Sequence, residues 1–124
     1  TGLFAEILAS QNESRHQRLL DRMKQLIHEH FSNSELCLRM LAEKLSLTEN
    51  YVSSFFKQYS GMNITKYIEK VRMEKAKELL LSEGMNTAEI SLAVGYNNPN
   101  TFYKAFKRYF GINPKAYREQ QKLQ

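Results

Sequence analysis

The feature that most constrains this chain is a stretch of seventeen residues that occurs twice, fifty positions apart. Residues 51–67 and 101–117 have six identical residues at matching positions. The identical pairs are Phe56/Phe106, Lys57/Lys107, Tyr59/Tyr109, Gly61/Gly111, Asn63/Asn113 and Tyr67/Tyr117. Both copies have the apolar spacing of a helix, with aromatic residues on one side. The chain is therefore expected to contain one helical unit twice.

The similarity between the two copies extends further back along the chain. A short apolar pattern and a helix-starting residue precede each stretch; they are Leu41, Leu45, Leu47 and Thr48 in the first copy and Ile90, Val94, Tyr96 and Asn98 in the second. Each copy predicts a short helix, a tight turn and a second helix, which together form a helix-turn-helix. Residues 38–60 are called the first motif below, and residues 87–110 the second motif.

Helical spacing predicts an all-α protein of seven helices, with no segment that alternates like a strand. We expect helices over residues 3–31, 38–45, 49–60, 64–82, 87–94, 99–110 and 114–121, and the polar residues 10–14 could interrupt the first of them. Capping residues mark several helix ends. They are Thr48, Asn63, Asn86, Asn98 and Asn113 at N-termini, Gly61 and Gly111 at C-termini, and Pro99 and Pro114 in first turns.

The apolar faces of these helices predict the core. In the helix over 49–60 the residues expected to point inward are Val52, Phe55, Phe56 and Tyr59. In the helix over 64–82 the residues that follow the helical period are Ile64, Tyr67, Ile68, Val71, Lys75, Leu79 and Leu80, with Ala76 as a small packing position.

We divide the chain into four parts on this basis. Residues 1–14 are interpreted as the remnant of an upstream linker, residues 15–63 as the first helix-turn-helix subdomain, residues 64–83 as a linker helix and residues 84–124 as the second subdomain. The sequence does not begin with Met, and we expect it to be part of a longer chain.

Charge is distributed unevenly along the chain. Residues 57–124 have a net charge of +6, whereas residues 1–56 have a net charge of −1. A basic half can face phosphate, although an ordinary solvated surface can have the same composition. The single cysteine, Cys37, excludes an internal disulfide, and no apolar run approaches the roughly 20 residues of a membrane span. We expect a cytoplasmic domain without membrane contact of its own, even if the parent protein is membrane-anchored.

In helix-turn-helix proteins the second helix lies in the major groove, and its N-terminal residues contact base edges. The residues expected to contact bases are Asn50, Ser53 and Ser54 in the first motif and Pro99, Asn100, Tyr103 and Lys104 in the second. Asn suits adenine, Lys suits guanine, and Ser suits several base edges. Tyr103 could instead stack on sugar and phosphate or cover the rim of the core. The residues expected to contact phosphate are Thr48, Lys57, Asn98, Thr101 and Lys107.

The helix over 64–82 explains why two copies would be useful. At about 1.5 Å per residue it is roughly 28 Å long, and one turn of B-DNA is about 34 Å. Two recognition helices joined by it could enter successive major grooves, with bent DNA or with one motif engaged less fully. Only the leading Asn is shared between the outer faces, so the two half-sites should differ in sequence.

Two other classes of function fit the sequence less well. A helical protein-interaction module that docks a partner helix would have the same aromatic core, but its binding to DNA would be weak and insensitive to salt. An enzyme is disfavoured because the sequence has no phosphate-binding loop, no nucleophile–base pair and no metal-ligand spacing. We therefore expect double-stranded DNA as the partner, with no catalytic residue, no cofactor and no metal.

Several reactive side chains have simpler structural explanations. The histidines are His16, His28 and His30; on a helix they do not face one another as a metal site needs, and we expect surface or edge packing. A redox-sensing role for Cys37 is disfavoured because nothing basic surrounds the thiol to activate it, and we expect a partly buried small apolar side chain instead. Arg72 is expected to pair with Glu69 or to bind backbone carbonyls rather than phosphate.

The motifs resemble those of a known family. The run Ile90-Ser-Leu-Ala-Val-Gly-Tyr96, followed by residues 102–118, resembles the C-terminal sequence of AraC/XylS-type transcription regulators. Residues 67–80 resemble the linker helix of that family. The resemblance covers about residues 18–119 and implies two helix-turn-helix subdomains that bind a promoter as part of a longer regulator. By position it places base contacts at Asn50, Ser53, Ser54, Pro99, Asn100 and Lys104.

Two residues depart from the family pattern. Pro99 has no side-chain donor or acceptor where members often have a polar residue, so that contact is either absent or becomes an apolar contact with a thymine methyl. Cys37 stands where members usually have a capping Ser or Thr, so that helix start is expected to be about 1 kcal/mol weaker. RNA polymerase is a further candidate partner. Dimerisation is expected upstream, so that this fragment is a monomer and its parent a candidate dimer.

Overall fold

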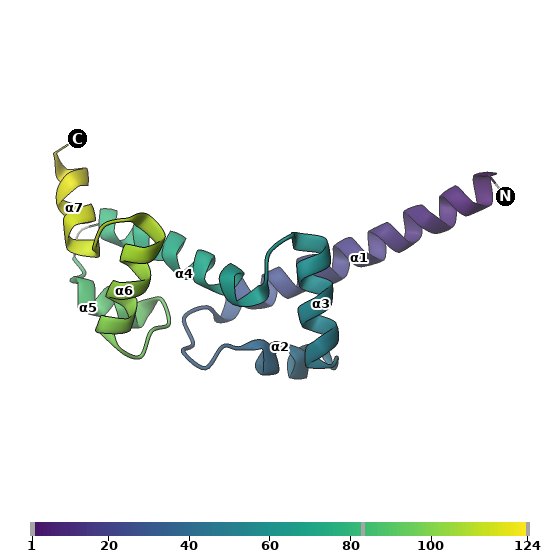
Figure 1. Cartoon of the computed structure of the whole chain (residues 1–124), viewed down its shortest axis with the longest axis horizontal. Coiled ribbons are helices and arrows are strands. Elements are labelled where there is room, and N and C mark those ends of the chain that lie inside the picture. The colour runs from purple at the N-terminus through teal and green to yellow at the C-terminus, as the bar shows by residue number, and fades with distance from the viewer. Residues whose placement is uncertain (1, 83, 124) are drawn as a thin grey trace. The chain divides into compact units, whose positions relative to one another are not determined.

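The chain is all-helical in the computed structural model, which describes residues 2–82 and 84–123 and has no strand among them (Figure 1). The seven helices are α1 (Gly2–His30), α2 (Leu38–Leu45), α3 (Glu49–Ser60), α4 (Ile64–Leu81), α5 (Thr87–Ala93), α6 (Pro99–Phe110) and α7 (Pro114–Lys122). The predicted fold class and helix order are confirmed. Three residues included in the predicted domain ranges, Thr1, Glu83 and Gln124, lie outside the described residues.

Helix α1 continues without a break through the polar residues 10–14, so the interruption considered there does not occur. Neither Gly nor Pro occurs between Gly2 and Gly61, and polar residues other than Gly and Pro cost a helix only a few tenths of a kcal/mol each, roughly. The buried residues of α1 all lie in its second half: Leu20, Met23, Leu26 and Ile27.

The helix ends form where the capping residues predict them. Oγ1 of Thr48 accepts a hydrogen bond from the amide of Tyr51 at 3.1 Å, and this bond starts α3. Side-chain oxygens of Asn63, Asn86, Asn98 and Asn113 accept main-chain amides in the same way. These bonds satisfy amides of the first turn that have no partner within the helix.

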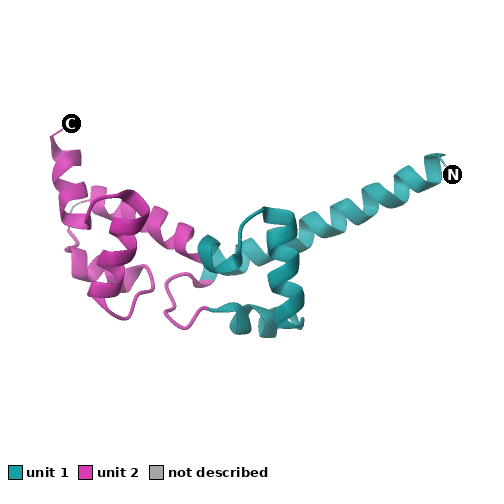
Figure 2. Cartoon of the chain, in the orientation of Figure 1, with its two compact units in different colours: residues 1–29, 37–67 teal, residues 30–36, 68–124 magenta. Residues whose placement is uncertain are grey.

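The chain forms two compact units, each built from two segments (Figure 2). Unit 1 consists of residues 1–29 and 37–67, and unit 2 of residues 30–36 and 68–124. Unit 2 therefore contains α5, α6, α7 and most of α4. It also contains His30–Leu36, the segment that joins α1 to α2. The first motif lies in unit 1 and the second in unit 2.

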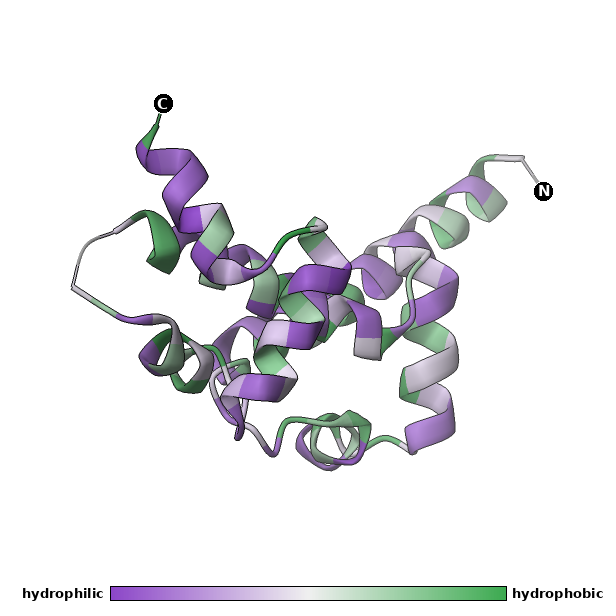
Figure 3. Cartoon of the chain, turned by 60° about the vertical axis from the view of Figure 1, so that its left-hand side comes forward, coloured by the Kyte–Doolittle hydropathy of each residue, from purple (hydrophilic) through white to green (hydrophobic). Residues whose placement is uncertain are grey.

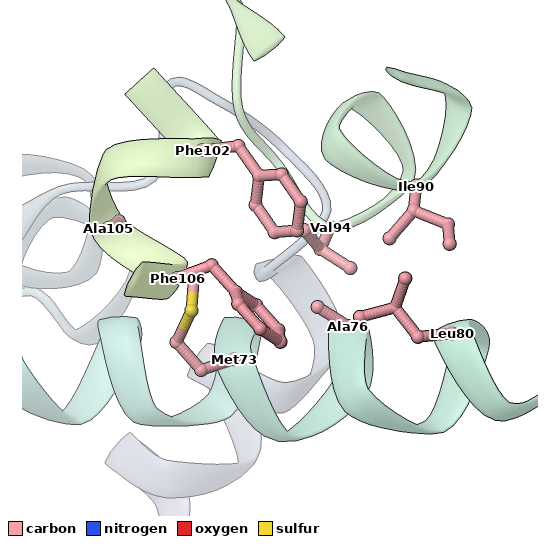
Figure 4. Packing of buried hydrophobic residues seen from close by; sticks show 8 residues of the cluster. All are labelled: Met73, Ala76, Leu80, Ile90, Val94, Phe102, Ala105 and Phe106. Carbon is pink, nitrogen blue, oxygen red and sulfur yellow. The ribbon is translucent and has the colours of Figure 1, made fainter. Parts of the chain in front are cut away.

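The core of unit 2 packs α6 and α5 against α4 (Figure 4). Its buried members are Phe102, Ala105 and Phe106 of α6, Met73, Ala76 and Leu80 of α4, and Ile90 and Val94 of the α5 region. Phe31 is partly buried against this cluster. Met73 is fully buried whereas Lys75 is exposed, so the prediction that Lys75 follows the inward period of α4 is wrong.

Helix α3 buries three of the four residues predicted to point inward. Val52, Phe55 and Phe56 are buried, but Tyr59 is 39% exposed, so that part of the prediction is wrong. The Tyr59 ring lies at the edge of the apolar face, 4.6 Å from the ring of His16 and 4.5 Å from that of Phe55. Figure 3 shows hydrophobic and hydrophilic residues alternating along the helices, as amphipathic helices require.

Candidate nucleic-acid interface

The two motifs have the same turn between their helices. In the first motif the amides of Ser46 and Leu47 donate to the carbonyls of Glu43 and Ala42, at 3.2 and 3.0 Å. In the second motif the equivalent bonds have the same lengths and join Gly95 to Leu92 and Tyr96 to Ser91. The left-handed residue of the turn is Ser46 in one motif and Gly95 in the other, with φ of 57° and 98°. The helix-turn-helix prediction therefore holds for both copies.

Helices α3 and α6 also bury the same positions. From residue 51 to residue 60, each side chain is buried, half-buried or exposed just as its counterpart between 101 and 110 is. The buried pairs are Val52/Phe102, Phe55/Ala105 and Phe56/Phe106. The six repeated identities include both buried and exposed residues, so α3 and α6 are alike on their exposed sides as well as in the core.

Helices α3 and α6 expose equivalent residues on their outer faces. In α3, Asn50, Ser54 and Lys57 are spaced by four and three residues, and all are exposed. Residues at this spacing lie on one side of a helix. The equivalent exposed residues of α6 are Asn100, Lys104 and Lys107. Each of these faces thus brings together two predicted base contacts and one predicted phosphate contact.

The other three predicted base contacts are half-buried: Ser53, Pro99 and Tyr103. The hydroxyl of Tyr103 lies 3.0 Å from Oγ1 of Thr87, the first residue of α5, and forms a hydrogen bond with it. Tyr103 therefore joins the two helices of the second motif. The role of Thr87 could not be predicted from the sequence, because a bond between residues sixteen positions apart leaves no local pattern.

Two predicted phosphate contacts are also helix caps. The side-chain oxygens of Thr48 and Asn98 already accept the amides of Tyr51 and Asn100. The Thr48 hydroxyl still has a proton to donate, and the Asn98 amide still has its NH₂ group. Both side chains are exposed, as is Thr101, so capping leaves donors available for phosphate.

The outer faces of α3 and α6 differ in charge. Helix α3 has one acidic and one basic residue, Glu49 and Lys57, whereas α6 has three basic residues and no acidic one: Lys104, Lys107 and Arg108. Arg108 donates to Glu69 of α4 at 2.8 Å, an ion pair that the sequence analysis did not predict. Because the Arg108 side chain is exposed, this pair adds little stability.

Arg72 has the structural role that was predicted, through backbone carbonyls. Its guanidinium donates to the main-chain oxygens of Phe31 and Asn33, both at 3.0 Å. It also lies over the ring of Tyr96, 5.4 Å from the ring centre. Burial lowers the pKa of Arg72 below its usual value. Burial likewise raises the pKa of Tyr96, an effect that the neighbouring Arg72 charge partly offsets. The hydrogen bonds of the Arg72 guanidinium are therefore made within unit 2, which supports a structural role rather than a phosphate contact.

The remaining reactive side chains are Cys37 and the histidines of α1. Cys37 is exposed, so the prediction that it is partly buried is wrong. The ring of His16 packs against Tyr59, and Nε2 of His28 lies 3.2 Å from the hydroxyl of Tyr67. Within residues 2–82 and 84–123, no three His, Cys, Asp or Glu side chains gather as they would around a metal ion.

No helix in the described part of the chain combines the length and the apolar character that a bilayer crossing needs.

The chain matches known proteins in sequence and in structure. The model of a helix-turn-helix domain family matches residues 41–120. The Msm operon regulatory protein of Streptococcus mutans is 35% identical over 101 residues, which are 82% of this chain and 36% of that protein. The chain spans between 14% and 36% of the length of four curated relatives that it matches.

Two solved structures share the fold at higher identity. One is the C-terminal domain of AraT, a response regulator from Geobacillus stearothermophilus, with 40% identity and a TM-score of 0.80 over 82% of this chain and 84% of that one. The other is the C-terminal domain of the two-component response regulator yesN from Fusobacterium nucleatum, with 39% identity and a TM-score of 0.77 over 79% and 95%. The two motifs, their common turn and these matches agree. The chain therefore belongs to the AraC-type family of helix-turn-helix transcription regulators and is a DNA-binding domain of that family.

Proposed function

We propose that this domain binds double-stranded promoter DNA sequence-specifically, with α3 and α6 in successive major grooves and without any catalytic step. One observation carries the proposal: both helices bury equivalent positions and expose, along one side, an Asn in the first turn, a second polar residue one turn later and a Lys in the last turn. The eighteen residues of α4 correspond to roughly 27 Å of helix. This length is somewhat less than the ~34 Å of one turn of B-DNA, so the proposal includes either bent DNA or one motif that engages its groove less fully.

The two motifs divide their contacts in the same way. Near the start of each helix, Asn50 and Ser54, or Asn100 and Lys104, contact base edges, because N-terminal residues of a recognition helix enter the groove most deeply. One turn later Lys57 or Lys107 contacts phosphate. Pro99 offers only an apolar contact, and half-buried Ser53 and Tyr103 lie at the side of the reading face. Donors left free by the caps, together with Thr101, add further phosphate contacts.

The parent protein is proposed to be a longer regulator that acts in the cytoplasm. The support is that these curated relatives are more than twice as long as this chain, and that one of them is named an operon regulatory protein. RNA polymerase is the second partner that we propose for the parent. Since neither motif needs a second copy of the chain to complete its outer face, this fragment is proposed to bind DNA as a monomer.

Site selection from random DNA, followed by affinity measurements at several salt concentrations, tests the proposal. We expect one selected site with two unlike half-sites. The logarithm of the affinity should fall with the logarithm of the salt concentration, by about 0.9 per phosphate contacted. A protein-interaction module would instead bind selected and random DNA equally weakly, with little dependence on salt. That result would reject the proposed function.

A further inference from the structure

We propose that Glu49 is a specificity-determining residue of the first motif and that it selects a cytosine in the major groove. This inference rests on the proposed function, because it assumes that α3 enters a groove. It adds a contact to those inferred above, since neither the outer-face pattern nor the family resemblance places a base contact at Glu49.

The internal repeat makes Glu49 the counterpart of a predicted base contact. Glu49 is the first residue of α3, as Pro99 is the first residue of α6, and the two lie fifty positions apart like the other equivalent pairs. Pro99 occupies a predicted base-contacting position of the second motif. Because the turns and the buried faces of the two motifs match, Glu49 stands where Pro99 stands in the other copy.

The Glu49 side chain is free for such a contact. It is exposed, and among the described residues it forms neither an ion pair nor a side-chain hydrogen bond. The capping role at this helix start is already filled, because Oγ1 of Thr48 accepts the amide of Tyr51. A carboxylate near a helix N-terminus interacts favourably with the helix dipole wherever it occurs. The dipole interaction stabilises the domain without DNA, so an experiment can separate it from a base contact.

The chemistry of a carboxylate restricts what it can bind in the groove. An ionised carboxylate only accepts hydrogen bonds. In the major groove guanine presents two acceptors, thymine an acceptor and a methyl group, and adenine a donor beside an acceptor. Cytosine alone presents a donor, its N4 amino group, without an acceptor on the same base. A carboxylate at the entrance to the groove is therefore repelled by phosphate and by most bases, and is stabilised when it meets cytosine.

The charges of α3 and α6 agree with different roles for the two motifs. The outer face of α6 is strongly basic, which favours DNA of any sequence, whereas Glu49 cancels the charge of Lys57 on α3. The second motif thus supplies most of the general affinity. The first motif has fewer basic side chains for phosphate, and we expect a larger share of its affinity to depend on the bases that it meets.

Site selection with Glu49→Gln tests the proposal, with Glu13→Gln of α1 as a control that removes the same charge from the same unit outside the motif. For Glu49→Gln we expect preference for cytosine at one base pair to fall by roughly five-fold, the scale of a single base contact. That base pair should lie in the half-site that Asn50→Ala alters, and adenine should become acceptable there, because Gln both donates and accepts. Glu13→Gln should leave every base preference unchanged.

Two results would overturn the proposal. In the first, Glu49→Gln raises the affinity for all sequences by the same factor, which means that Glu49 only repels phosphate. In the second, it changes the melting temperature and no base preference, which means that Glu49 only interacts with the helix dipole. Failure of the proposed function has a different signature. If the proposed function is wrong, the unmodified domain selects no sequence over random DNA. If only the role of Glu49 is wrong, the unmodified domain selects a site, and Glu49→Gln selects the same site.

Discussion

Arg72 binds the main chain of a segment that precedes it by about forty residues, with Nε donating to the Phe31 oxygen at 3.0 Å. The same oxygen faces Gly95, the left-handed residue of the second motif's turn. Phe31, Arg72 and Gly95 thus meet at one point of unit 2. The turn that precedes α6 is therefore packed against Phe31, which lies outside the second motif and far from it in the sequence.

Gly95→Ala should destabilise the domain by about 3 kcal/mol or more. A Cβ at this position would lie 2.2 Å from the Phe31 oxygen and 2.9 Å from Nε of Arg72, and the φ of +98° already disfavours a side chain. The control is Gly111→Ala, where φ is +85° but no atom lies within 4 Å. That variant should lose only about 1–2 kcal/mol, the cost of the backbone conformation. Denaturant unfolding measures both; equal losses would contradict the steric argument.

Arg72→Lys should lower the free energy of unfolding by about 2 kcal/mol, although it keeps the charge. Hydrogen bonds to charged groups contribute about 1.5–3 kcal/mol. A single ammonium group cannot bind the carbonyls of Phe31 and Asn33 as the planar guanidinium does. Arg39→Lys is the matched control, because Arg39 is exposed and pairs with Glu43 one turn away on the surface of α2. Thermal melts should show a clear loss for the first variant and almost none for the second.

Cys37→Ser should stabilise the domain by about 0.5–1 kcal/mol. Cys37 is the N-cap of α2, with the extended backbone that an N-cap needs (φ −156°, ψ 173°), but its side chain makes no capping bond. A serine hydroxyl in the same place can accept a free amide of the first turn. Cys37→Ala removes the thiol without adding an acceptor and should not stabilise. If Ser and Ala raise the melting temperature equally, capping is not the cause.

Contacts to bases and to phosphate should differ in what their loss does to DNA binding. Asn50→Ala and Lys104→Ala are expected to relax the preference at particular base pairs and to cost about 1–3 kcal/mol each. Lys107→Ala should weaken binding to all sequences alike and reduce the salt dependence by about one contact. Site selection with each variant gives the preferences directly. The assignment is inverted if Lys107→Ala changes the selected sequence and the other two do not.

Stability should fall in alkaline solution. Burial raises the pKa values of Tyr67 and Tyr96 in the folded state, whereas the pKa of an unfolded tyrosine is about 10. The stabilisation linked to these neutral phenols is therefore fully present below about pH 10 and is lost as the pH rises through the folded-state values. Tyr96→Phe should make the loss shallower, as measured by melting temperature against pH. The exposed Tyr51→Phe serves as the control.

Local chemistry explains which parts of the fold could be predicted. Asn63 and Asn113 start helices, and Gly61 and Gly111 end them, because each acts on backbone groups within a few residues. The repeat then predicted that α3 and α6 would be equivalent helices, each with aromatic residues on one side. Interactions that depend on a distant residue could not be predicted this way. The hydrogen bond of Tyr103 to Thr87 is an example, because nothing near either residue indicates it.

The wrong predictions share a different cause. A period of 3.6 residues gives the centre of an apolar face but not its edges. Tyr59 lies at such an edge and is exposed, and Lys75 was placed inward while Met73 occupies the core. Cys37 was judged by its residue type, and free cysteines are usually buried, but at a helix start its side chain meets solvent.

The segment His30–Leu36 lies in unit 2, although the helices on both sides of it belong to unit 1. No single cut in the polypeptide can therefore yield two complete units. A chain that starts at Ile64 would contain the whole second motif but would lack Phe31 and Asn33. Transfer of the second motif alone between regulators, by recombination or in the laboratory, would leave behind part of its own scaffold. The two motifs are consequently best inherited and exchanged as a pair.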